Sequence, residues 1–165
     1  MRVQYFIPTL LLSLCPLSSS ASESPVPVVE NFYSWAIQPA PQDLERGLGP
    51  VSHVLGRELL AALETQRAYE KACARLVPPD IKPYMLDQSP FFLGADGAKT
   101  LVSAKATVNG DVARVSAQLA YDHIRWTDTV ILRRENSHWV IVNIKWEERS
   151  LTQRLVEFAS NRCVP

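Results

Sequence analysis

Asp128 is the residue of this 165-residue sequence whose setting best suits a chemical role. Asp128 is two positions from both Trp126 and Val130, and every second residue of a strand points to the same face, so the pattern predicts that these side chains share one face of a strand. If that face is buried, the carboxylate loses solvent and its pKa rises, which suits a general base. The alternative is a structural aspartate bonded to a neighbouring strand or to Arg125 or Arg133. We favour this alternative, because structural networks also perturb carboxylates.

The remaining polar candidates are isolated in the sequence. Asp122 and His123 follow a predicted strand, and they form a relay only if the turn directs both inward toward a third group such as Tyr69; ordinary turn chemistry is the simpler interpretation. His53 and His138 are expected on the surface or as capping residues. Three histidines without a Cys, Asp or Glu cluster at ligand spacing predict no metal site and no cofactor. No phosphate-binding loop or nucleophile motif occurs.

Four tryptophans supply a large aromatic surface for a chain of this length. Trp139 is expected in the core, and at least one of the other three is expected to be exposed, with Trp126 as the candidate to anchor a partner. A long connector at residues 77–98 contains several prolines and glycines, and such loops are often functional, although it could simply cover the core. The candidate binding residues are Trp126, Asp128, Asp122, His123 and Asp87.

The composition is balanced, with 17 basic and 17 acidic residues and no net charge. This balance argues against a nucleic-acid partner. The length fits one domain with a proper core. We therefore expect a single domain over residues 22–165.

The first 21 residues read as a signal peptide. Arg2 precedes a leucine-rich run, and small residues end at Ala21, after which we place the cleavage site. The apolar run is short for a membrane span. Cys15 follows Leu14 rather than the small residue that lipidation requires, so we expect Cys15 to be removed with the signal peptide. A lipid anchor through Cys15 is the alternative. The expected location is periplasmic or secreted.

Two cysteines, Cys73 and Cys163, remain after this cleavage. Thiols in exported chains usually pair, and a bridge closing so long a loop stabilises by about 4–5 kcal/mol in the chain-entropy model. We predict a disulfide between them. The alternative is two unpaired buried thiols.

Hydrophobic periodicity predicts the order of the elements. Helices are expected at 28–37, 52–76 and 147–162, and strands at 102–108, 113–121, 126–133 and 138–146. Asn109-Gly110 is typical of a type I′ hairpin turn. In the last strand, strict alternation puts Trp139 and Ile141 on one face and Ile144 and Trp146 on the other. The expected fold is α+β, a strongly curved four-stranded antiparallel sheet wrapped on the N-terminal helices, with a C-terminal helix.

Four segments carry a family resemblance: "VENFYSWAI", "LDQSPFFLGAD", "AKATVNGDVARVSAQL" and "HWVIVNIKW". Together they resemble the nuclear-transport-factor-2-like superfamily, and more narrowly a bacterial family of exported proteins of unknown function, often lipoproteins. The resemblance spans Val28 to Trp146, and the sequence departs from the family in its missing lipidation motif and its longer C-terminal helix with Cys163. It implies a cone-shaped fold with an open pocket. The superfamily includes isomerases, dehydratases and non-enzymatic binders, so the fold alone assigns no chemistry.

Three functions are consistent with these features. The first is an exported module that binds another protein, such as an immunity or inhibitor protein or an accessory subunit of an envelope complex. The second is a carrier of a small apolar ligand. The third is an isomerase- or hydrolase-like enzyme that uses Asp128 as its base. The absence of a catalytic motif favours the first.

Overall fold

The protein is an α+β domain, as the periodicity predicted. The computed structural model describes residues 23–38, 47–76, 89–94 and 97–160. Its helical elements are α1 (Val26–Ala36), the short 3-10 helix η1 (Gly49–Val54), α3 (Arg57–Cys73) and α4 (Leu151–Ala159). Its strands are β1 (Thr100–Asn109), β2 (Val112–Tyr121), β3 (Ile124–Glu135), β4 (His138–Trp146) and β5 (Arg149–Ser150). None of the helices described is long and apolar enough to cross a membrane.

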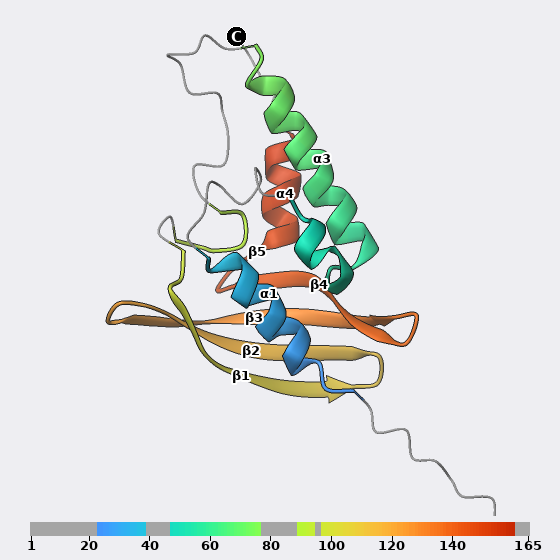
Figure 1. Cartoon of the computed structure of the whole chain (residues 1–165), viewed down its shortest axis with the longest axis vertical. Helices are drawn as coiled ribbons and strands as arrows, with labels where there is room; N and C mark the ends of the chain where they lie inside the picture. The colour runs from blue at the N-terminus through green and yellow to red at the C-terminus, as the bar shows by residue number, and fades with distance from the viewer. Residues whose placement is uncertain (1–22, 39–46, 77–88, 95–96, 161–165) are drawn as a thin grey trace, which may run out of the picture.

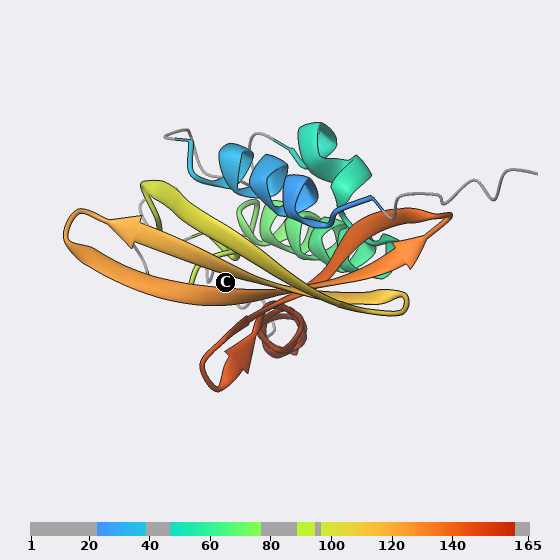
Figure 2. The same cartoon turned by 90° about the horizontal axis from the view of Figure 1, so that it is seen from below.

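The strands form one open antiparallel sheet in the order β1-β2-β3-β4-β5. The prediction of four strands was wrong by one, because the chain after β4 turns back and pairs briefly with its end before α4 begins. Helix α1 lies across one face of the sheet (Figure 1), and Figure 2 shows η1 and α3 on that same side. Helices α3 and α4 project side by side beyond the β4 edge, with α4 on the other side of that edge.

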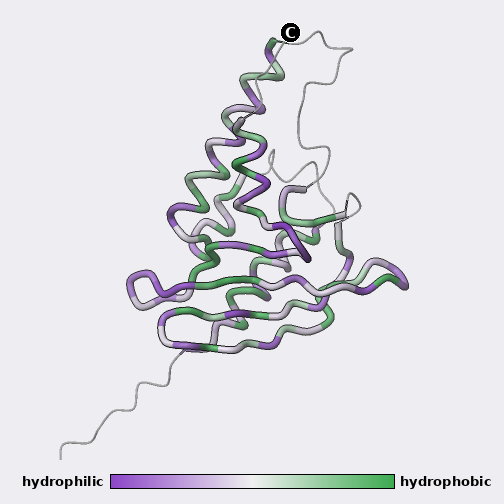
Figure 3. The backbone as a smooth tube through the Cα atoms, turned by 180° about the vertical axis from the view of Figure 1, so that it is seen from behind, coloured by the Kyte–Doolittle hydropathy of each residue, from purple (hydrophilic) through white to green (hydrophobic). Residues whose placement is uncertain are grey.

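The core lies between α1 and the sheet face that it covers. Hydrophobic and hydrophilic residues alternate along the strands (Figure 3), which gives the sheet one apolar face. On β2 this face consists of Ala113, Val115, Ala117 and Leu119, all fully buried. Helix α1 contributes aromatic rings, among them Phe32, which meets Phe91 edge-on at 5.2 Å between ring centres.

The helix predicted at 52–76 is interrupted. Leu55 is extended and forms a parallel bridge with Ile141 of β4, and the Gly56 N–H donates to the Ile141 carbonyl at 2.8 Å. A Cβ atom at Gly56 would lie 3.0 Å from a methyl group of Val142 and 3.2 Å from the Ile141 carbonyl oxygen, so the close approach favours glycine. The break lets η1 cover the core while α3 starts in a new direction.

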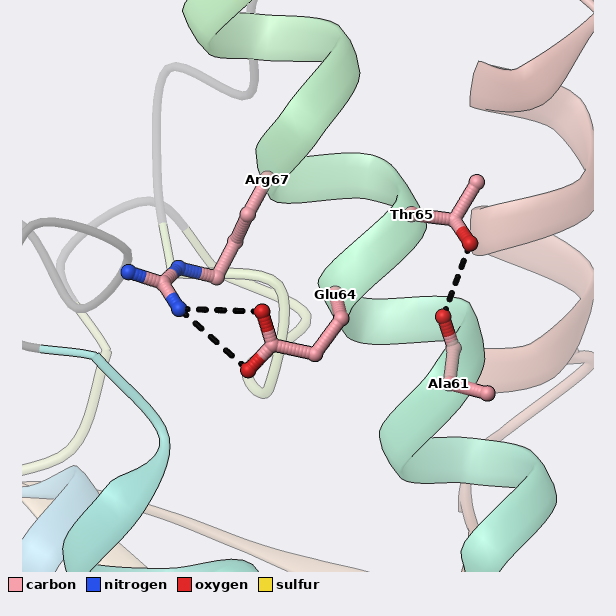
Figure 4. A network of polar contacts seen from close by, with 4 residues as sticks. All are labelled: Ala61, Glu64, Thr65 and Arg67. Carbon is pink, nitrogen blue, oxygen red and sulfur yellow. Dashed lines mark hydrogen bonds and ion pairs between the residues drawn. The ribbon is translucent and has the colours of Figure 1, made fainter.

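Helix α3 turns a polar side to solvent. The Arg67 guanidinium binds both carboxylate oxygens of Glu64, one turn earlier, at 3.1 and 3.3 Å, and the Thr65 hydroxyl donates to the Ala61 carbonyl at 2.8 Å (Figure 4). The opposite side buries Leu59, Leu63 and Cys73. The same side also buries two polar residues, Gln66 and Glu70, and the Gln66 amide donates to the Glu70 carboxylate at 3.1 Å.

A β-bulge in β4 makes the predicted assignment of its side chains to the two sheet faces wrong for part of the strand. Ile131 pairs with Asn143 while the next residue, Leu132, pairs with Ile141, so Val142 is the extra residue. The bulge shifts the alternation by one position. Trp139, Ile141, Ile144 and Trp146 are therefore all buried, with Trp139 and Trp146 at 2% exposure each. The strand is apolar on both faces of a strict alternation because the core-facing residues have opposite parity in its two halves, and because Val140, outside the core cluster, is buried as well.

The turn between β1 and β2 also differs from its prediction. Asn109 pairs with Val112 as the last pair of the ladder, so the loop is Gly110-Asp111, one residue later than expected. Positive φ occurs at Gly110 (59°) and not at its neighbours, as in a type II′ turn rather than type I′. The hairpin itself is confirmed.

Candidate functional site

The site is built around Asp128, which β3 holds on the buried face of the sheet. Its side chain is buried, with 1% of the residue exposed. The Tyr33 hydroxyl, from α1, donates to Asp128 Oδ2 at 2.9 Å across the layer between helix and sheet. Neither Arg125 nor Arg133, the partners considered from the sequence, makes this contact.

The second carboxylate oxygen, Asp128 Oδ1, is buried without a hydrogen-bond partner in the described part of the chain, and so is the indole N–H of Trp146. Buried polar atoms are nearly always satisfied, so an orphaned carboxylate oxygen needs an explanation. The indole N–H groups of Trp146 and Trp126 lie near enough to lower the pKa of the carboxyl but form no hydrogen bond of normal distance and angle with Oδ1, so this oxygen can accept one from a bound molecule.

Burial raises the pKa of Asp128 from 3.8 to about 6. The hydrogen bond from Tyr33 and the nearby indole groups of Trp146 and Trp126 lower this pKa, but they only partly offset the loss of solvent. Burial and the adjacent Asp128 charge raise the pKa of Tyr33 well above its usual value, so Tyr33 remains a donor. The result is a carboxyl group that titrates close to neutral pH.

Asp128 borders a pocket of about 500 Å³. The pocket is located where the hairpin of β2 and β3 meets the end of β4 and the segment 89–94. Its lining is mainly apolar and aromatic. The described lining residues are Leu93, Gly94, Gly97, Tyr121, Ile124, Trp126, Thr127, Asp128, Trp146 and Glu147.

Arg154 of α4 fixes one wall of this pocket. Its guanidinium donates to the carbonyl of Pro90 at 3.1 Å and to that of Phe92 at 2.6 Å, and it stacks on the Trp146 ring at 4.5 Å. Arg154 is itself nearly fully buried. These contacts tie the segment that precedes Leu93 to the end of β4, so α4 positions the wall although it lies outside the pocket.

The other polar candidates lie apart from this constellation. Asp122 and His123 form the exposed turn between β2 and β3, where Asp122 has a φ of 51° and pairs with Lys99 at 2.8 Å. They do not form a relay with Tyr69, which belongs to α3. His53 is exposed on η1. Asp87 lies outside the described residues.

His138 and the tryptophans complete the account of the predicted residues. His138 is exposed, 3.9 Å from the Glu23 carboxylate. Trp139 is buried, as expected, and so are Trp35 and Trp146. Trp126 is half-buried and borders the pocket, so it is the tryptophan accessible to a bound molecule. In the described chain no group of acidic, histidine or cysteine side chains is arranged to hold a metal ion.

The sequence did not identify Tyr33 as a site residue. The tyrosine is 95 positions from Asp128, and its pattern in α1 is that of a core aromatic. Trp146 was expected on the opposite face from Trp139, and only the bulge brings it to the pocket. A tyrosine among the helix residues that face a predicted buried aspartate is the signal that could have found the pair.

Cys73 is fully buried at the end of α3. Helices α3 and α4 end on the same side of the molecule (Figure 1). Cys163 lies outside the described residues, and the disulfide stays a prediction.

Comparisons with known proteins give no assignment: no family model, no curated protein and no solved structure matches the chain.

Proposed function

We propose that the protein binds a small, predominantly apolar molecule in the pocket beside Asp128, and that a polar group of this molecule contacts the carboxylate. The single observation that carries the proposal is Asp128 Oδ1, a buried acceptor without a partner, at the wall of a mostly apolar cavity. Ligand sites combine an apolar lining with a few polar groups in this way. A volume of about 500 Å³ suits a ligand of drug size.

The fold and location proposed from the sequence fit this function. We retain the assignment to the nuclear-transport-factor-2-like superfamily as a proposal, with a cone-like curved sheet that wraps the helices and leaves the pocket at its open end. We also propose export through residues 1–21, followed by a periplasmic or secreted location; anchoring through Cys15 is the alternative. An exported carrier of small molecules is consistent with both.

A second candidate is an enzyme of the isomerase or hydrolase type with Asp128 as its base. The observation that favours it is the carboxyl pKa of about 6, near the optimum for proton abstraction at neutral pH. Such an enzyme would lose turnover in Asp128→Asn while it still bound its substrate. A carrier shows no turnover in either form.

Binding of a protein partner, the first interpretation of the sequence, has less support. It was based on export, on the absence of a catalytic motif and on the supply of tryptophans, but three of the four tryptophans are buried in the core. Trp126 remains available for such a contact. Capture of a stoichiometric partner from envelope extract by the wild-type protein, undiminished when the pocket is filled, would favour this function.

The test of ligand binding uses 1-adamantanemethanol, a compact apolar alcohol that does not absorb near the tryptophan band. Binding should change the emission of Trp126 and Trp146, which border the pocket. Gly94→Leu should abolish the change, because Gly94 lines the pocket and a Cβ there meets no atom within 4 Å, which leaves room for a larger side chain to occupy the site. Gly49→Leu is the matched control, since Gly49 also has open space and lies on η1.

No emission change with wild-type protein, or an equal change in both glycine variants, would overturn the proposed pocket function.

A further inference from the structure

We propose that the pocket selects hydrophobic amines: the ligand carries a protonated primary or secondary ammonium group that donates to Asp128 Oδ1, attached to an apolar body that fills the cavity. This inference rests on the proposed function, because it specifies the class of ligand for the same pocket. It follows from three features of the lining: the unpaired carboxylate oxygen, the balance of charge and the aromatic surface.

The unpaired oxygen defines what the ligand must donate. Tyr33 already satisfies Asp128 Oδ2, while Oδ1 is buried at the pocket lining without a hydrogen-bond partner in the described chain. A neutral donor would satisfy its geometry but leave the charge uncompensated in a buried site. An ammonium N–H supplies both the hydrogen bond and the opposite charge, and charge-assisted bonds of this kind are roughly twice as strong as neutral ones.

The charged residues of the pocket lining also favour a cationic ligand. Among the lining residues that the structure describes, Asp128 and Glu147 are acidic and none is a lysine, arginine or histidine. Glu147 is exposed at the end of β4, where it can attract a cation toward the pocket. An anionic ligand would meet two like charges.

Two cations contact residues of the lining, and both have other partners. Arg154 donates to the Pro90 and Phe92 carbonyls and stacks on the Trp146 ring. Lys99 pairs with Asp122 and stacks on Tyr121 at 4.3 Å from the ring centre. No cation is among the causes of the pKa shift of Asp128, so neither of them compensates its charge.

The aromatic lining also suits a cation. Trp126 is half-buried beside Asp128 on the same strand face, and indole is the best aromatic partner for a cation within about 6 Å of its ring. The apolar remainder of the lining, which includes Leu93 and Ile124, suits the body of the ligand. The site thus resembles a hydrophobic slot with one anionic end.

The experiment compares three ligands with one apolar body: 1-adamantanemethylamine, 1-adamantanemethanol and 1-adamantanecarboxylate. Affinities are measured at pH 7.5 by tryptophan emission and by calorimetry. We expect the amine to bind at least tenfold more tightly than the alcohol, and the carboxylate to bind more weakly than the alcohol. The amine is fully protonated and Asp128 ionised at this pH, so each ligand tests one charge state.

Variants of the acidic lining residues test whether the preference for the amine arises in this pocket. Asp128→Asn should reduce amine binding to the level of the alcohol while alcohol binding persists, because asparagine keeps the shape and loses the charge. Glu147→Gln should weaken amine binding by a smaller factor, about two- to fivefold. Glu148→Gln is the matched control, since Glu148 is the exposed neighbour outside the pocket lining and should have no effect.

The outcomes separate the two proposals. If none of the three ligands binds, the pocket function fails and the inference fails with it. If the alcohol or the carboxylate binds at least as tightly as the amine, the pocket function stands and the amine preference is refuted. If Asp128→Asn retains the amine preference, the cation is recognised elsewhere and the inference is again overturned.

Discussion

Replacing Asp128 with asparagine should change how the stability of the protein depends on pH. The folded state raises the pKa of this carboxyl from 3.8 to about 6, so it holds the proton more tightly than the unfolded chain does. Below about pH 3 both states are protonated, and burial of the group costs no charge desolvation. As the pH rises toward and beyond 6, the folded protein must bury an ionised carboxylate, and this contribution to stability is lost.

The size of the effect follows from the shift. One pKa unit corresponds to about 1.4 kcal/mol, so a shift of about two units amounts to about 3 kcal/mol of lost stability at high pH. Between about pH 4 and pH 8 we expect about 2–3 kcal/mol of this change, because the group is already partly ionised at pH 4 in the unfolded chain. Asparagine has no such cost. The free energy of unfolding of Asp128→Asn, relative to that of the wild type, should therefore increase by about 2–3 kcal/mol between pH 4 and pH 8.

Urea denaturation followed by tryptophan emission at intervals between pH 4 and pH 8 measures the difference. Subtracting the two proteins cancels the titration of all other groups. Asp111→Asn, in the exposed turn between β1 and β2, is the matched control for removal of a carboxylate at the surface. A flat difference for Asp128→Asn would refute the argument that the carboxylate is desolvated in the folded protein.

Three further predictions test the surroundings of this group. Tyr33→Phe removes a donor that lowers the pKa of Asp128, so carboxyl NMR titration should place that pKa above about 6; an unchanged value would contradict the hydrogen bond. Arg154→Met leaves two buried carbonyls without their donor and should cost about 2–3 kcal/mol of unfolding free energy, measured by urea denaturation, whereas a neutral result would show that the guanidinium is replaceable. Thiol titration under denaturing, non-reducing conditions should find neither Cys73 nor Cys163 reactive; two reactive thiols would exclude the bridge.

The sequence predicted the sheet well because period-two alternation and turn residues are local signals. Its antiparallel hairpins, the extent of β4 and the buried face of β3 follow from them. The bulge at Val142 is not a local property, since it depends on which residues of β3 pair with β4. A register shift of one residue reverses every later side chain. For this reason the burial of Trp146 beside Asp128 could not be read from alternation alone.

The helical layer was predicted less completely, again for a physical reason. The apolar stripe from 52 to 76 continues across Gly56, so periodicity alone suggests one helix. The break arises because Leu55 and Gly56 pair with the backbone of β4, a contact between distant parts of the chain. The same limit applies to Asp128: its face was predictable, but its partner Tyr33 depends on how α1 docks on the sheet.

Desolvation of one carboxylate connects the stability of the fold with the selectivity proposed for the pocket. Removal of water from Asp128 destabilises the folded protein at neutral pH, and an ammonium ligand that pairs with Oδ1 would offset part of that cost on binding. A neutral ligand offsets less of it, and an anionic ligand adds a second charge. The pH dependence of stability and the preference for amines therefore have one cause. If the stability difference for Asp128→Asn proves flat, the carboxylate is solvated, and the main reason to expect a cationic ligand disappears with it.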